Sequence, residues 1–134
     1  MTEFPLKIVT PDGICFEGPA EEIVVRSVGG DVAIMARHTN FVTALGMGPA
    51  LIVAGGQRRT AACIGGMLSV VDGKVTLLPT TFEWSDQIDV ERAEASQRRA
   101  DAMLKDKNTS ETELKLAQAR LRRALVRKSV ASGK

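Results

Sequence analysis

The sequence predicts an α+β protein. It has an N-terminal antiparallel β-sandwich or barrel over residues 1–85 and a C-terminal antiparallel two-helix hairpin over residues 86–134. Three observations lead to this fold class. Runs of β-forming residues recur at intervals of roughly 8–12 residues in the first half, which is typical of sandwiches and barrels. The hydrophobic pattern changes to a helical period after Trp84. A polar segment, residues 105–110, then divides the helical half in two.

Turn residues separate the expected strands. Residues 11–13 (PDG) follow the first strand, residues 28–31 form the next sharp turn, and Asp72-Gly73 makes the clearest hairpin. Breaks are also expected at Gly48-Pro49 and after the glycine pair 65/66. None of the glycine pairs at 29/30, 55/56 and 65/66 is followed by a helix. We therefore interpret them as turns or bulges and not as phosphate-binding loops.

Capping residues place the two helices. Asp89 is a plausible N-cap for a helix ending near residue 105, and the pair Ser110 and Glu113 forms a capping box for a helix over about 111–130. The residues after 129 are expected to fray. The expected apolar stripe of the second helix is Leu114, Ala117, Leu121, Ala124 and Leu125. Because the facing residues are mostly alanine, the hairpin buries little area and is a candidate mobile element.

Composition excludes several classes of protein. Apolar residues make up 44% of the chain and charged residues 25%, which indicates a globular protein and not a disordered one. No apolar run is long enough to cross a bilayer, and the first residues lack a signal-peptide pattern, so a cytoplasmic location without membrane insertion is expected. Cys15 and Cys63 are far apart and His38 is the single histidine, so no metal site is expected. No catalytic set of side chains is evident either.

Basic residues concentrate in the second helix, and a charged stripe runs along the first. From Thr112 onward the chain has seven basic residues and one acidic residue, which suggests an acidic partner. Arg92 and Arg99 share one helix face, with Asp89 close enough to hold the Arg92 guanidinium. Arg123 and Arg127 share a face of the second helix, flanked by two further arginines, Arg120 and Arg122. These side chains could converge on an anion near the open ends of the hairpin, or they could form a solvated face.

Four sequence segments, in order, resemble the epsilon subunit of bacterial F-type ATP synthases. LKIVTPDGICFEG is similar to that family's opening strands, and GGDVAIMARHTNFVTAL to its central segment. GGMLSVVDGKVTLL is similar to its next hairpin, and residues 88–93 (IDVERA) match its I-D-x-x-R-A motif. Asp31 replaces the family's usual Glu, Ala36-Arg37 replaces Pro-Gly, and Asn40 replaces Pro. These departures alter one loop.

The resemblance implies a non-catalytic subunit of the central stalk, on the cytoplasmic face of the bacterial plasma membrane, that couples rotation to ATP synthesis and proton or sodium flow. Its sandwich would contact the gamma subunit and the c-ring, with Asp31 and His38 on the contacting loop. Its helices would either fold back or extend into the alpha/beta catalytic head and inhibit ATP hydrolysis. The residues expected to contact the head are Arg120, Arg122, Arg123 and Arg127.

Some members of this family bind ATP in the folded hairpin, so the resemblance also implies a regulatory ATP, with no cofactor required. The matching positions are Glu83, Asp89, Arg92, Ala93, Arg99, Arg123 and Arg127. Two other hypotheses compete with a stalk subunit. One is a small β-barrel nucleic-acid adaptor with a basic helical arm, which the scarcity of aromatic residues and the acidic β half disfavour. The other is an ATP-binding sensor outside any motor.

Overall fold

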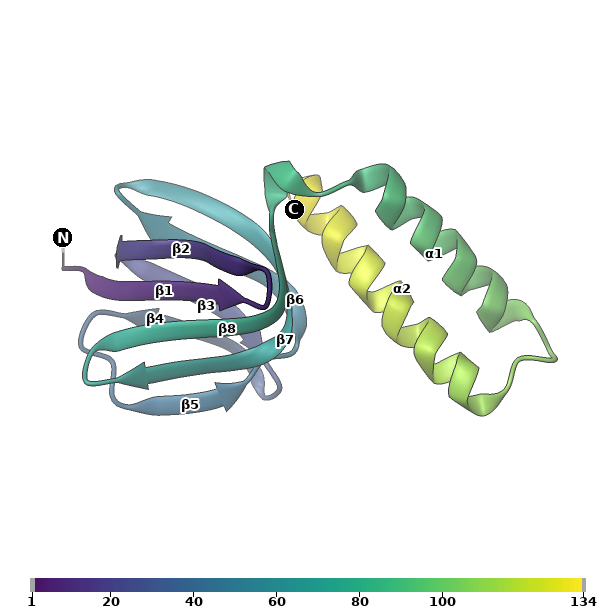
Figure 1. The fold of residues 1–134 in the computed structure, drawn as a ribbon, viewed down its shortest axis with the longest axis horizontal. Helices are drawn as coiled ribbons and strands as arrows, with labels where there is room; N and C mark the ends of the chain where they lie inside the picture. The colour runs from purple at the N-terminus through teal and green to yellow at the C-terminus, as the bar shows by residue number, and fades with distance from the viewer. Residues whose placement is uncertain (1, 134) are drawn as a thin grey trace. The chain divides into compact units, whose positions relative to one another are not determined.

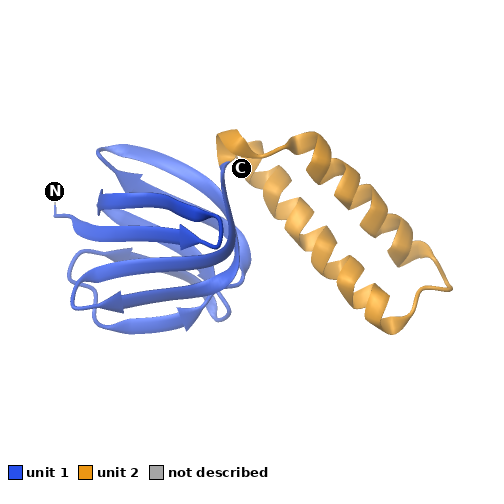
Figure 2. Ribbon diagram, in the orientation of Figure 1, with its two compact units in different colours: residues 1–84 blue, residues 85–134 orange. Residues whose placement is uncertain are grey.

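The computed structural model describes residues 2–133 and divides into two compact units, residues 1–84 and residues 85–134 (Figure 2). The first unit consists of β-strands and the second of a short 3-10 turn and two helices (Figure 1). The strands are β1 (Phe4–Thr10), β2 (Gly13–Ala20), β3 (Glu22–Ser27), β4 (Gly30–Met35), β5 (Phe41–Ala44), β6 (Met47–Ala54), β7 (Gln57–Val71) and β8 (Lys74–Trp84). The remaining elements are η1 (Ser85–Gln87), α1 (Val90–Lys105) and α2 (Glu111–Ala131).

The sheet runs in the order β2-β1-β8-β7-β6-β3-β4, and β5 pairs with β7. The predicted antiparallel sandwich is confirmed, with one exception: β1 and β8 pair in parallel, with Leu6 opposite Val75. These are the first and last strands of the unit, so the six strands between them make the connection that a parallel pair needs. No crossover helix is required.

Two expected breaks between strands lie elsewhere. β7 continues through the glycine pair 65/66 without a shift of register, because Ile64 pairs with Thr81 and Gly66 with Pro79, so the turn or bulge expected there is absent from the β7–β8 ladder. The break between β5 and β6 falls at Leu45-Gly46, and Pro49 lies inside β6. Pro49 is tolerated there because β6 pairs with β3 only over residues 51–53, so its missing N–H interrupts no ladder on that side.

Inward-facing side chains of the strands form the core of the first unit. Leu6 and Ile8 alternate along β1 with exposed residues, as a half-buried strand requires. The largest fully buried side chains are Leu6, Ile8, Ile23, Val25, Ile34, Ile52, Leu68, Val70 and Leu77. Trp84, the last residue of β8, belongs to this core, and the Arg59 guanidinium carbon lies 3.6 Å from the centre of its ring.

Local hydrogen bonds set both helix starts, as the sequence predicts. The Asp89 carboxylate accepts from the backbone N–H of Arg92 at 3.1 Å. Ser110 Oγ accepts from the Glu113 N–H at 3.2 Å and donates to the Glu113 carboxylate at 3.1 Å. The two bonds from the Arg92 and Glu113 N–H groups satisfy backbone donors that the first turn of each helix leaves unpaired. The expected N-caps of both helices are confirmed.

Alanines form the seam between the two helices. Ala93 and Ala100 are buried on α1, and Ala117 and Ala124 are buried on α2. Two expectations for α2 are wrong. Leu125 is 45% exposed, because it lies about 100° round the helix from Ala124, away from the seam. Val130 is buried and lies within α2, so the chain does not fray from residue 130.

Candidate functional site

A hydrogen bond between the helices shows which of their sides meet. Lys128 Nζ on α2 donates to Gln97 Oε1 on α1 at 2.8 Å. Gln97 is rotated about 40° round the axis of α1 from Ala93, and Lys128 is rotated about 40° round the axis of α2 from Ala124. Both rotations follow the direction in which each helix winds from its first residue to its last. In an antiparallel pair, positions displaced in the same sense from the seam lie on one side of the hairpin. The Lys128–Gln97 bond therefore marks one side of the seam.

The four arginines of the predicted anion site lie on the opposite side. On α1, Arg92 and Arg99 are rotated about 100° and 120° from Ala93, in the direction opposite to Gln97. On α2, Arg123 and Arg127 are rotated about 100° and 60° from Ala124, in the direction opposite to Lys128. Arg92 lies near the start of α1, and Arg123 and Arg127 lie in the second half of α2, towards the open end of the hairpin (Figure 1). Arg99 lies in the half of α1 nearer the segment that connects the two helices. Arg92 and Arg99 are exposed, and Arg123 and Arg127 are half-buried. The fold thus gathers four guanidiniums along one side of the helix pair.

The remaining residues of the predicted site have different surroundings. The Asp89 carboxylate accepts a hydrogen bond from the Arg92 backbone N–H, so Asp89 caps the helix where an ion pair with the Arg92 guanidinium was expected. Ala93 is buried in the seam, where its small side chain lets the helices approach. Glu83 is half-buried on β8 and belongs to the first unit. Of the two flanking arginines, Arg120 lies on the arginine side of α2, and Arg122 is displaced about 160° from Ala124, away from the seam.

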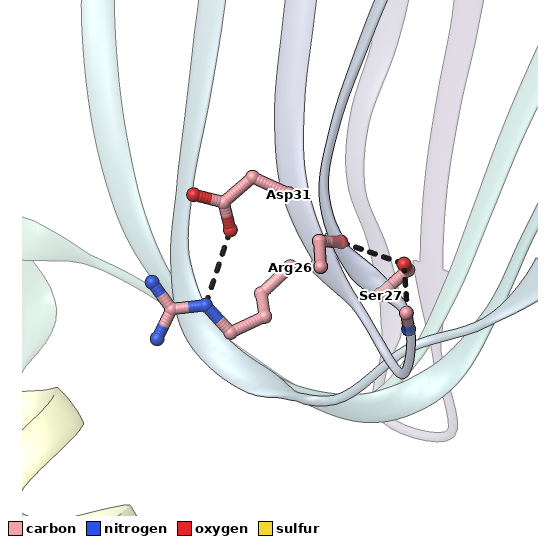
Figure 3. Close-up of polar contacts among 5 residues, drawn as sticks. Arg26, Ser27 and Asp31 are labelled. Atoms are coloured by element: carbon pink, nitrogen blue, oxygen red, sulfur yellow. Dashed lines mark hydrogen bonds and ion pairs between the residues drawn. The ribbon is translucent and has the colours of Figure 1, made fainter.

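The second predicted site lies at the turn between β3 and β4. Asp31 was expected in a turn but lies in β4, directly opposite Arg26 of β3, because the turn consists only of Val28 and Gly29. Arg26 Nε donates to Asp31 Oδ1 at 3.1 Å (Figure 3). Ser27 holds the turn closed: its Oγ donates to the Gly30 carbonyl at 2.6 Å and accepts from the Gly29 N–H at 3.1 Å.

His38 lies beyond the other end of β4, so the expectation that Asp31 and His38 share one loop is wrong. The strand between them carries Asp31 at its second position and ends at Met35, a separation of about 13 Å along an extended backbone. His38 Nδ1 lies 2.8 Å from the Thr39 carbonyl oxygen, and its ring packs edge-on against Phe41. Its loop is tied to the β7–β8 turn, since Asn40 Oδ1 accepts from the Asp72 N–H.

An exposed apolar surface covers the outer side of β5, β7 and β8. We call it the outer apolar face; it consists of Val42, Met67, Val71 and Leu78. Met67 is paired with Leu78 on one side and Ala44 on the other, and Val42 is paired with Ser69, two residues from both Met67 and Val71. Side chains opposite one another or two apart along a strand share a face. The four side chains are between 42% and 60% exposed.

Sequence reasoning missed Arg26, Gln97 and Lys128. Arg26 could have been found, because a two-residue turn at Val28-Gly29 pairs it with Asp31 across the hairpin, and opposite charges favour such positions. No local signal identifies the contact between Gln97 and Lys128, which are 31 residues apart. Residues 2–133 contain no cluster of three or more His, Cys, Asp or Glu side chains placed to hold a metal ion. Within the same range, no helix is both long and apolar enough to cross a membrane.

Comparisons with known proteins define the class of this molecule. The family model of the ATP synthase delta/epsilon chain β-sandwich domain matches residues 3–85, and that of the delta/epsilon chain long α-helix domain matches residues 86–132. The chain therefore belongs to the ATP synthase delta/epsilon chain family. The resemblance to bacterial epsilon subunits is confirmed, and the comparisons give no support to the nucleic-acid alternative.

Individual relatives agree with the family models. The chain is 42% identical to the ATP synthase epsilon chain of Ruminococcus albus over 135 residues, covering all of both chains. It is 41% identical to the ATP synthase epsilon chain of Caldicellulosiruptor saccharolyticus, covering 95% of this chain and 92% of that one. A chain in the mitochondrial ATP synthase structure of Euglena gracilis superposes with a TM-score of 0.83 at 20% identity, covering 100% and 83% of the two chains, and this likeness shows the fold.

Proposed function

We propose that this chain is a stalk subunit that joins the gamma subunit and the c-ring of a bacterial ATP synthase, on the cytoplasmic face of the plasma membrane. The observation that carries the proposal is the match of the whole chain to bacterial ATP synthase epsilon chains. In this role the chain transmits rotation to the alpha/beta head and performs no chemistry of its own. The ion that drives the rotation is a proton or a sodium ion.

The outer apolar face supports a stalk role, because a contiguous exposed apolar surface is typical of an interface. We assign this surface to the gamma subunit. Met67 lies near its centre, between β5 and β8. Replacing Met67 by Lys would place a charge in the contact and leave it without a partner.

The test is retention of the chain on immobilised gamma subunit of the same organism. Met67→Lys should abolish retention, whereas Ile14→Lys, at a comparably exposed apolar position on β2, should leave it unchanged. Circular dichroism of both variants checks that they fold. Equal retention of the Met67→Lys variant and the parent would show that the gamma subunit does not bind the outer apolar face.

The arginine side of the hairpin supports a second proposal, a regulatory ATP held by the folded helices. Four guanidiniums on one side supply forked donors that match phosphate oxygens, and Arg123 and Arg127 are already partly withdrawn from water. A ligand that binds only the folded hairpin stabilises it by about 2.7 kcal/mol at a hundredfold excess over Kd. ATP would then hold α1 and α2 together. Without it, α2 would extend and place Arg120, Arg122, Arg123 and Arg127 against the catalytic head, inhibiting hydrolysis.

Calorimetric titration of the isolated chain with ATP tests this second proposal. The parent should release heat, and Arg92→Ala and Arg123→Ala should not. Arg98→Ala is the matched control, because Arg98 is exposed on the same helix but lies about 100° round from Arg99. Loss of binding in all three variants would indicate a general effect of positive charge and not a specific site. If the parent releases no heat at millimolar ATP, the proposal that the hairpin binds ATP is wrong.

A further inference from the structure

The Arg26–Asp31 pair has a geometry that leaves most of the guanidinium available. Only Nε of Arg26 contacts the Asp31 carboxylate, whereas arginine and carboxylate commonly pair through two nitrogens. Figure 3 shows the two terminal nitrogens directed away from Asp31. Among the described residues these nitrogens have no hydrogen-bond or ion-pair partner. The side chains of Arg26 and Asp31 are 47% and 62% exposed, so an incoming group can reach them.

The stem of Arg26 is held against the sheet. A Cβ atom added to Gly48 would lie 2.8 Å from Arg26 Cβ and 3.1 Å from both Cδ and Nε, so the stem runs directly over the backbone of Gly48. The Arg26 carbonyl accepts from the Gly46 N–H at 2.9 Å, which fixes the backbone beneath it. A side chain ordered in this way loses less conformational entropy on binding than a free surface arginine.

The charges around Arg26 point to one kind of ligand. The charge of Arg26 is balanced by Asp31, and Val28, two residues further along the chain in the turn, is apolar and 73% exposed. Recognition of a membrane surface uses clusters of basic side chains, whereas this turn carries a single basic side chain, Arg26. A single forked donor beside an apolar tip fits a single carboxylate side chain on a protein surface.

We propose that Arg26 binds a carboxylate side chain of a partner subunit, and that Asp31 orients Arg26 and does not itself contact the partner. The inference rests on the proposed function, because the partner is sought within the ATP synthase. It reverses the expectation that Asp31 is the contact residue. Asp31 is a positioning residue, Gly48 provides the surface for the stem, and the terminal nitrogens of Arg26 are the binding group.

The test measures Kd of the chain for the ATP synthase from which this subunit has been removed, at two salt concentrations. Arg26→Gln should raise Kd about tenfold and reduce its salt dependence, as expected when a charged hydrogen bond is lost. Arg26→Lys, which keeps the charge but loses the fork, should recover part of the salt dependence. Gly48→Ala, which keeps every charge, should also raise Kd because it displaces the stem.

The double variant separates orientation from contact. Asp31→Asn alone should raise Kd about threefold, and adding it to Arg26→Gln should cause no further change, because its effect acts through Arg26. Additive losses would make Asp31 an independent contact and overturn the proposal. Unchanged binding by Arg26→Gln would also overturn it, as would Arg26-dependent binding to phosphatidylglycerol vesicles without an effect on the enzyme complex.

The Met67→Lys variant keeps this proposal distinct from the proposed function. If Met67→Lys weakens assembly and Arg26→Gln does not, the stalk role stands and the Arg26 proposal fails. If the parent chain does not bind the depleted enzyme, both fail. Thermal unfolding of each variant checks that the loss of affinity is not a loss of fold.

Discussion

Lys128 near the end of α2 donates a 2.8 Å hydrogen bond to Gln97 near the middle of α1. The bond is partly buried and joins two helices whose seam is built mainly from alanines, which bury little apolar area each. The bond therefore adds to the modest apolar burial that holds the hairpin closed.

Removing this bond should loosen the hairpin without affecting the sandwich. Gln97→Ala should cost about 1 kcal/mol, the usual net value of such a bond. Amide hydrogen exchange in α1 and α2 should become faster by a corresponding factor of about five, with exchange in β7 unchanged. Lys115→Ala, at an exposed lysine of α2, should leave exchange as in the parent. Equal acceleration in both variants would contradict the role of the Lys128–Gln97 bond.

The glycine pair Gly65-Gly66 inside β7 should be intolerant of side chains. Gly66 has φ of +103°, and an added Cβ would collide with the Leu78 carbonyl oxygen and lie 2.6 Å from Pro79 Cα. Gly66→Ala should lower the free energy of unfolding by at least about 3 kcal/mol. Gly55→Ala is the control: φ is +59° there, but no atom lies within 4 Å of the added Cβ, so its cost should be about 1 kcal/mol. Urea unfolding followed by Trp84 fluorescence distinguishes the two.

Cys63 should make stability depend on pH in the alkaline range. Burial raises the pKa of its thiol from 9.0 to about 12, so the folded state keeps the proton when the unfolded state has lost it. The contribution is complete below pH 9 and is lost as the pH rises towards 12. Between these values the free energy of unfolding of the parent should fall more steeply than that of Cys63→Ala, by up to about 1.4 kcal/mol per pH unit. Parallel curves would contradict the burial of the thiol.

Arg37 occupies a backbone conformation that favours glycine. Its φ is +66°, in the left-handed region that side chains with a Cβ atom rarely adopt. Arg37→Gly should stabilise the chain by about 0.5–1 kcal/mol, since relief of left-handed strain exceeds the greater flexibility of glycine in the unfolded state. Arg58→Gly in β7 should destabilise the sheet instead, because its backbone is extended. A shift of both melting temperatures in the same direction would contradict the argument.

The sequence by itself determined the features that rest on neighbouring residues. Asp89 and the Ser110–Glu113 pair define the helix starts because each bonds a backbone N–H three residues away, and Asp72-Gly73 turns the β7–β8 hairpin because its backbone preferences are local. The spacing of the arginines on each helix followed from the helical period alone. Recognition of the family followed from motifs that can be read in order along the chain.

Only the tertiary structure decided the relationships that depend on distant segments. The parallel pairing of β1 with β8 joins the two ends of the first unit, and β7 passes through a glycine pair that local signals predict as a break. The burial of Val130 and the exposure of Leu125 depend on where the helix seam runs, which the partner helix sets. The orientation of Arg26 depends on Asp31 across a turn and on Gly48 on another strand. These contacts are set by packing between segments far apart in the chain, which no local preference encodes.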